Sequence, residues 1–112
     1  MGRLEKPPDI EAEIHFLPTE AGGRQSPVYS GYHPDHDMQL AGTLNGAKHR
    51  YLDVEQVAPG DTVRAEMWFL APELQQGRLF EGMRFTVQEG PTIVAWGRIL
   101  CVLNPTLRLI RN

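Results

Sequence analysis

A closing β-hairpin is predicted by residues 84–103, which read RFTVQEGPTIVAWGRILCVL. In its first arm Phe85 and Val87 alternate with polar residues, which is typical of a strand that buries one face. A turn signal follows at Glu89-Gly90-Pro91. Thr92 to Leu103 then form the longest candidate strand of the sequence. The chain is therefore expected to close its fold with an antiparallel pair of strands.

The second arm of this hairpin is apolar at both alternating sets of positions, so its buried face is not obvious. One explanation is that both faces are covered. Another is that Trp96 marks a partner site. A third is that Gly97 carries a β-bulge that resets the alternation, because a glycine in mid-strand permits a kink or a close approach of another segment.

Other strands are predicted upstream of the hairpin. Ile10 to Phe16 alternate strictly between apolar and polar residues, and Val63 to Phe69 do the same. Residues 37–40 and 50–54 are weaker candidates, separated by a segment in which Asn45-Gly46 is a strong turn signal. These patterns indicate about six short strands in total.

Helical structure is nearly absent from the predicted elements. One helical turn is expected at residues 72–76, because proline is tolerated at a first helical position. Residues 19–32 hold three glycines and a proline, which is typical of a long shaped loop. Short strands without a convincing helix favour an all-β fold, either a small closed antiparallel barrel or a sandwich.

The length of 112 residues, 41% of them hydrophobic, gives room for one packed domain. Residues 1–8 are predicted to be a flexible tail, because Pro7-Pro8 follows charged residues and resists both helix and sheet pairing. The single β-barrel domain is expected to span residues 9–104. Residues 105–112 are expected to form a C-terminal tail.

Net charge and cysteine content indicate which classes of partner and which cellular compartment to expect. A formal net charge of −3 argues against DNA binding, and any RNA contact requires a local basic patch. The single cysteine, Cys101, excludes an internal disulfide and fits a reducing compartment, so a cytoplasmic location is expected. No signal-peptide pattern opens the chain, and its longest apolar run is too short to span a membrane.

Sequence support for catalysis is weak. Gly46-Ala47-Lys48-His49 lacks the pattern of a phosphate-binding loop, so no nucleotide or other cofactor is expected. His33, His36 and Asp37 have a spacing that offers two imidazoles and a carboxylate to a metal, and a small metal-dependent hydrolytic enzyme is the alternative hypothesis. In an extended segment, however, residues three apart face opposite ways, and no fourth ligand follows. The leading interpretation therefore has no metal and no enzymatic activity.

Four groups of residues resemble, in the same order, segments of the third, C-terminal domain of elongation factor Tu. They are the strand Ile10–Ile14, the loop Ala21–Pro27 with Gly31-Tyr32-His33-Pro34, the turn Val57–Asp61, and the hairpin segment Gly82–Gly90 with Gly97. The resemblance covers about residues 9–103, which is nearly the whole chain. It implies a six-stranded antiparallel β-barrel.

In that family the domain contacts the backbone of the tRNA T-stem through a Gly-Gly-Arg loop and a Glu-Gly-Gly turn, whose second glycine is Pro91 here. It also packs on a GTPase domain and meets a nucleotide-exchange factor. The resemblance therefore implies an RNA-binding edge in this chain, made of Gly22, Gly23, Arg24, Arg84, Glu89 and Gly90. Arg24 is expected to contact phosphate, and the backbone of Gly90 is expected to approach a sugar.

Departures from the family pattern point toward a different use of the barrel. Asp35, Gln88 and Thr92 stand where the family has polar or basic residues, which lowers the attraction for phosphate. The polar segment His36–Leu40 replaces an aromatic-rich strand and suits a barrel that stands alone.

The leading hypothesis is a non-catalytic binding module associated with translation through a protein or tRNA partner. A protein partner is expected to use Trp68 and Trp96, for which burial in the core is the alternative.

Overall fold

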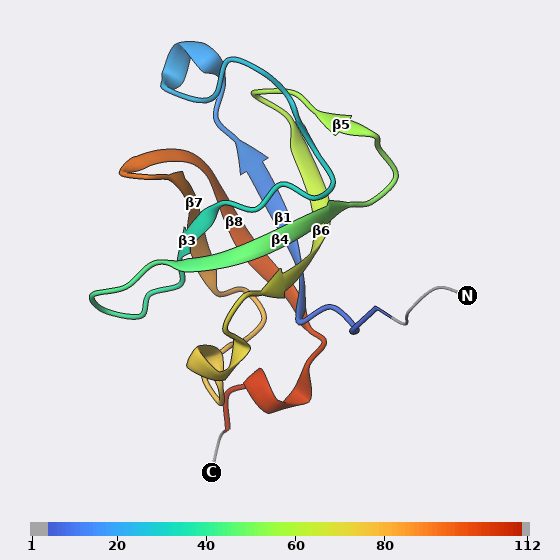
Figure 1. Cartoon of the computed structure of the whole chain (residues 1–112), viewed down its shortest axis with the longest axis vertical. Coiled ribbons are helices and arrows are strands. Elements are labelled where there is room, and N and C mark those ends of the chain that lie inside the picture. Colours follow the sequence, from blue (N-terminus) through green and yellow to red (C-terminus); the bar gives the residue numbers. More distant parts are fainter. Residues whose placement is uncertain (1–4, 111–112) are drawn as a thin grey trace.

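The computed structural model describes residues 5–110, so residues 1–4 and 111–112 of the predicted tails lie outside the described residues. The described chain is built from β-strands and three short 3-10 helices (Figure 1). The barrel strands are β1 (Ile10–Phe16), β3 (Asp35–Asp37), β4 (Asn45–Tyr51), β6 (Thr62–Phe69), β7 (Arg84–Glu89) and β8 (Thr92–Val102). No helix between residues 5 and 110 has the length and apolar character needed to span a membrane.

The six barrel strands form one closed sheet in the order β1-β6-β4-β3-β7-β8. Every neighbouring pair is antiparallel, and β1 closes the sheet by pairing with both β6 and β8. A separate two-stranded ribbon joins β2 (Val28–Tyr29) to β5 (Gln56–Val57) at one end of the barrel (Figure 1). The predicted all-β fold with a closed six-stranded antiparallel barrel is confirmed.

Strict alternation places the core on the inner face of the strands. In β1 the apolar side chains Ile10, Ala12, Ile14 and Phe16 are buried, while the polar residues between them are half-buried on the outer wall. The same pattern runs through β6, where Val63 to Phe69 was predicted as a strand. Burying a medium-sized apolar side chain contributes about 1.5–3 kcal/mol, so these inward rows fix the register of both strands.

Two β-bulges explain why β8 is apolar at both sets of alternating positions. Gln88 pairs with Ile93 while Val87 pairs with Ala95, which leaves Val94 as an extra residue. A second shift lies opposite Glu11 and Ala12, where Leu100 is the extra residue. Each bulge switches the inward-facing set of side chains.

The bulge considered at Gly97 is therefore wrong. Gly97 instead lies directly across from Phe85 in the β7–β8 ladder. A Cβ at this position would lie 2.5 Å from Phe85 Cζ. The absence of a side chain there lets the phenyl ring fill the interior.

The turn predicted at Asn45-Gly46 is also wrong, because both residues begin β4. Asn45 pairs with His36 of β3, and its side-chain oxygen accepts a hydrogen bond from Gln75 Nε2 at 2.9 Å. These tertiary contacts override the local turn preference of the dipeptide. The chain reverses instead at Ala41-Gly42, where Gly42 has a φ of 78°.

The C-terminal segment packs on the barrel, although a tail was predicted from residue 105. Residues Pro105–Leu107 form a 3-10 helix, and Leu107 is 1% exposed. Leu109 N–H donates to the Leu79 carbonyl at 2.7 Å, next to the helical turn Pro72–Gln75 that the sequence predicted. The packed domain therefore extends past residue 104, because the apolar Leu107 side chain belongs to the buried core.

Candidate functional site

The Gly-Gly-Arg loop begins with a 3-10 turn, Thr19–Ala21, at one end of the barrel (Figure 1). Gly22 follows with a φ of 94°, a conformation that glycine adopts without steric cost. A Cβ on Gly23 would lie 2.1 Å from the Leu17 carbonyl oxygen. The two glycines therefore permit a tight reversal that sets the direction in which Arg24 leaves the loop.

Arg24 connects this loop to the β7–β8 turn. Its guanidinium donates to the Glu89 carboxylate through Nη1 and to Ser26 Oγ through Nη2 at 3.1 Å. The same group lies over the ring of Tyr32, 5.2 Å from its centroid. Tyr32 donates its hydroxyl hydrogen to Glu89 as well, and burial together with that carboxylate raises the pKa of the phenol. Two segments 65 residues apart are thereby joined by charge-assisted bonds.

The structure brings five of the six predicted RNA-edge residues into this one region. Gly22, Gly23 and Arg24 come from the loop, while Glu89 and Gly90 come from the hairpin turn. Arg84 is not among them, since it starts β7, and five residues of strand span about 17 Å. Arg24 is the cation that remains in this part of the predicted RNA-binding edge, and it is ion-paired with Glu89.

Trp96 lies on the outer wall of the barrel and is 36% exposed. Its indole ring stacks on His15 with centroids 4.0 Å apart and an interplanar angle of 17°. His15 Nε2 lies 3.1 Å from the Glu13 carboxylate, which accepts its hydrogen, and Nδ1 accepts from the Thr62 hydroxyl at 2.8 Å. The Arg84 guanidinium lies 5.4 Å from the indole centroid. The tryptophan is therefore held in a stack that crosses β1, β8 and β7.

Trp68 also faces outward, from β6, but it is covered by other parts of the chain. Its Nε1–H donates to the Lys6 carbonyl at 2.7 Å. Lys48 and Arg50 lie over its ring at 4.8 and 5.1 Å from the centroid. Glu5 pairs with both cations, so the segment before β1 lies against this side of the barrel. The alternative that the tryptophans form the core is wrong for both, and Trp96 is the more accessible of the two.

The proposed metal-ligand cluster is not assembled. His36 points into the barrel and is fully buried, whereas His33 and Asp37 are exposed. This is the expected consequence of alternation in an extended segment. Between residues 5 and 110, no three His, Cys, Asp or Glu side chains come together in a way that would hold a metal ion.

His36 instead belongs to a buried hydrogen-bond chain that the sequence did not reveal. His36 Nδ1 donates to the Asn45 carbonyl at 2.9 Å, so its Nε2 is the acceptor for His49 Nε2–H at 2.8 Å. His49 Nδ1 then accepts from the Tyr51 hydroxyl at 2.9 Å. All four imidazole nitrogens of His36 and His49 then have a hydrogen-bond partner while both rings are neutral.

Burial keeps both imidazoles neutral. It lowers the pKa of His36 to about 4 and that of His49 well below its usual 6.5. The chain has the character of a structural network that fixes β3 against β4, since its polar atoms bond to one another and to the backbone.

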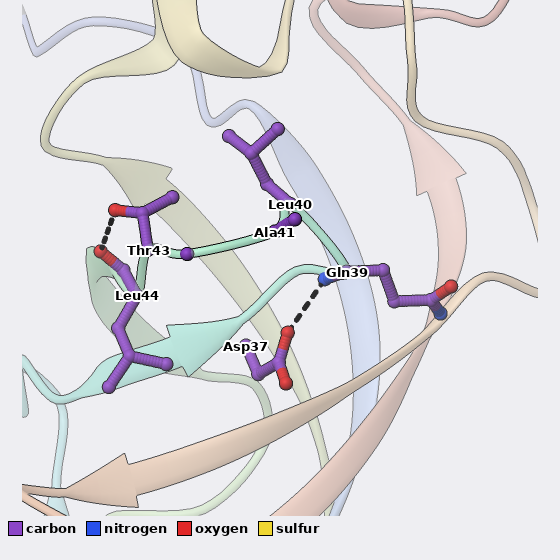
Figure 2. A pocket seen from close by; sticks show the side chains of 7 residues that line it. Asp37, Gln39, Leu40, Ala41, Thr43 and Leu44 are labelled. Carbon is purple, nitrogen blue, oxygen red and sulfur yellow. Dashed lines mark hydrogen bonds between the residues drawn. The ribbon is translucent and has the colours of Figure 1, made fainter.

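Two surface hollows lie beside the loop that follows β3. One, of about 530 Å³, is lined by Asp37 and residues 39–44 and is shown in Figure 2. The other, of about 320 Å³, is lined by Asp37, Gln39, Arg84, Phe85, Thr86 and Trp96. Asp37 and Gln39 line both hollows. The side chain of Gln39 reaches away from the loop (Figure 2), and its amide donates to the Arg84 carbonyl at 2.7 Å.

No protein-family model matches the chain. The site that remains is a pair of surfaces: the Arg24–Glu89 contact at one end of the barrel, and the Trp96 stack with its hollow on the wall.

Proposed function

We propose that the protein is a non-catalytic binding module, a stand-alone barrel of the kind found as the C-terminal domain of elongation factor Tu. It acts in the cytoplasm, in association with the translation machinery. Support comes from the four motif groups in family order together with the closed six-stranded barrel. Function inferred from a fold needs a site as well, and the two outer surfaces supply it.

The contact between Arg24 and Glu89 is the observation that carries the proposal. These residues belong to the two elements that contact tRNA in the family, and here they meet through a direct ion pair at one end of the barrel. Residues 65 positions apart have no local reason to pair. Their meeting supports the motif assignment, because the resemblance links both elements to one binding edge.

The charge pattern favours a protein over tRNA as the partner. Arg24 is neutralised by Glu89, and the whole chain carries a net charge of −3. Affinity for nucleic acid depends on cations that displace counterions from phosphates. An arginine that already holds a carboxylate contributes little to that exchange, whereas an exposed tryptophan is a typical anchor for a protein partner.

The proposal is tested by affinity purification of the tagged protein from lysate, with separate detection of proteins and tRNA. A ribosomal protein or translation factor is expected to co-purify in stoichiometric amounts. Trp96→Ala is the comparison variant, because the exposed indole is removed while the core is unchanged. Recovery of no translation component, protein or RNA, would contradict the proposal.

Glu89→Gln is expected to strengthen tRNA binding about three- to tenfold at low salt, because it frees the Arg24 guanidinium for phosphate. Fluorescence titration with bare and aminoacylated tRNA at two salt concentrations measures the change. Glu81→Gln removes the same charge from an exposed position and is expected to have a smaller effect. Micromolar binding by the unmodified protein that Arg24→Ala abolishes would instead make tRNA the partner.

A further inference from the structure

Among the arginines on the described barrel strands, Arg84 lacks an acidic partner. Arg24, Arg50, Arg64 and Arg98 each form an ion pair with a glutamate. Among residues 5–110, no carboxylate oxygen lies within 4.0 Å of the Arg84 guanidinium. Arg84 also lies directly across the β7–β8 ladder from Arg98, and like charges in that arrangement are destabilising. An anion supplied from outside would remove this unfavourable arrangement.

Trp96 next to it is held rigidly in place. The indole stacks on His15 of β1, and the Arg84 guanidinium of β7 lies 5.4 Å from its centroid. His15 is itself fixed by Glu13 and by the Thr62 hydroxyl. A rigid aromatic side chain binds without a large loss of conformational freedom, which is the character of an interface anchor.

The hollow of about 320 Å³ adjoins both side chains. Its walls are fixed by Gln39, which donates its backbone N–H to the Asp37 carboxylate at 2.9 Å and its side-chain amide to the Arg84 carbonyl at 2.7 Å. The Asp37 carboxylate is thus engaged by its own loop. The hollow is of the size of a small binding site and suits one bulky apolar side chain.

We call the surface made of His15, Arg84, Trp96 and the adjoining hollow the Trp96 face. We propose that the Trp96 face is a docking site for an acidic peptide segment of a protein partner. A glutamate or aspartate of the partner pairs with the two terminal nitrogens of the Arg84 guanidinium, and a neighbouring apolar side chain enters the hollow. The inference rests on the proposed binding function and assigns it a site and a ligand chemistry.

The same geometry disfavours RNA at this face. Stacking of a nucleobase requires a free aromatic face, whereas the indole of Trp96 is already stacked on His15 and has the Arg84 guanidinium 5.4 Å from its centroid. A phosphate backbone requires several unpaired cations, whereas the neighbouring Arg98 is already paired with Glu13.

The test selects binders from a random peptide library displayed on phage, with the whole protein as bait, and measures their dissociation constants by fluorescence anisotropy. Selected peptides are expected to carry an acidic residue beside a bulky apolar one. Arg84→Gln and Trp96→Ala are expected to weaken their binding about tenfold or more. Arg64→Gln, the same change at an ion-paired arginine of β6, is expected to alter it less than about twofold.

Charge reversal gives a positive outcome that a folding defect cannot imitate. Arg84→Glu is expected to lose the acidic peptide and to bind a version in which lysine replaces the acidic residue. The inference is overturned if no acidic peptide is enriched, or if Arg84→Gln leaves the affinity unchanged. It is also overturned if a single-stranded RNA oligonucleotide, and no peptide, binds in an Arg84-dependent way.

These outcomes are separable from those of the proposed function. Acidic peptides that need Arg84, together with a lysate that yields no translation component, would keep the docking site and overturn the association with translation. A translation component that Arg84→Gln captures equally well would keep the association with translation and overturn the docking site.

Discussion

Gly97→Ala is expected to lower the free energy of unfolding by about 3 kcal/mol, which is a large part of the stability of a small domain. The added Cβ would lie 2.5 Å from Phe85 Cζ and 3.0 Å from the Glu13 carbonyl oxygen. Phe85 is 3% exposed and packs edge-on against His36, so its ring cannot move aside without disturbing the core. Urea denaturation followed by circular dichroism measures the loss.

Gly46→Ala is the matched control, because Gly46 also lies in a barrel strand. A Cβ there would meet its nearest atoms at 3.8 Å, which is ordinary contact. Its midpoint is expected to stay close to that of the unmodified protein. The double variant Gly97→Ala with Phe85→Leu is expected to recover part of the loss, since the smaller side chain leaves room. Equal stability of Gly97→Ala and Gly46→Ala would contradict the packing described here.

The second large effect is loss of stability in mild acid, caused by the buried histidines. The pKa of His36 is lowered to about 4 by burial, and that of His49 is also low, while both return to about 6.5 in the unfolded chain. Above pH 6.5 neither state takes up a proton at these sites, so their network is fully stable. As the pH falls from 6.5 towards 4, the two histidines bind protons in the unfolded state but not in the folded state, so the free energy of unfolding decreases.

The expected loss from His36 alone is about 2 kcal/mol by pH 5 and about 3 kcal/mol by pH 4, with a further loss from His49. Unfolding midpoints in urea between pH 7.5 and 5 measure it, above the range in which carboxylates titrate. His33→Gln removes an exposed histidine and is expected to keep the dependence. His49→Gln is expected to reduce the number of protons taken up on unfolding. A midpoint that stays constant from pH 7.5 to 5 would rule out a buried neutral pair.

Alternation made the regular strands predictable. Ile10–Phe16 and Val63–Phe69 each bury one face, so a period of two appears directly in the residue types. The bulged strand β8 was harder to predict from the sequence. Val94 and Leu100 have no residue signature that separates them from ordinary strand residues, and their positions depend on the partner strands.

The sequence predicted only those residues of the candidate site whose type or motif is typical of a binding surface. Arg24, Glu89 and Trp96 were all singled out, but the ion pair and the stack on His15 join segments far apart in sequence. The role of His49 was missed because the strand was expected to begin at residue 50. The alternation of buried and outward residues from Ala47 to Tyr51 was the available signal.

Site-specific photo-crosslinking in living cells tests the binding function most directly. Trp96 is replaced by p-benzoylphenylalanine, which keeps an aromatic side chain on the outer wall, and an equivalent replacement of the exposed Gln76, which belongs to neither candidate surface, serves as the control. A protein of the translation machinery is expected to be captured at position 96, less efficiently at position 76, and to be lost from position 96 when Arg84→Glu is added. Capture of no translation protein at position 96 would contradict the account.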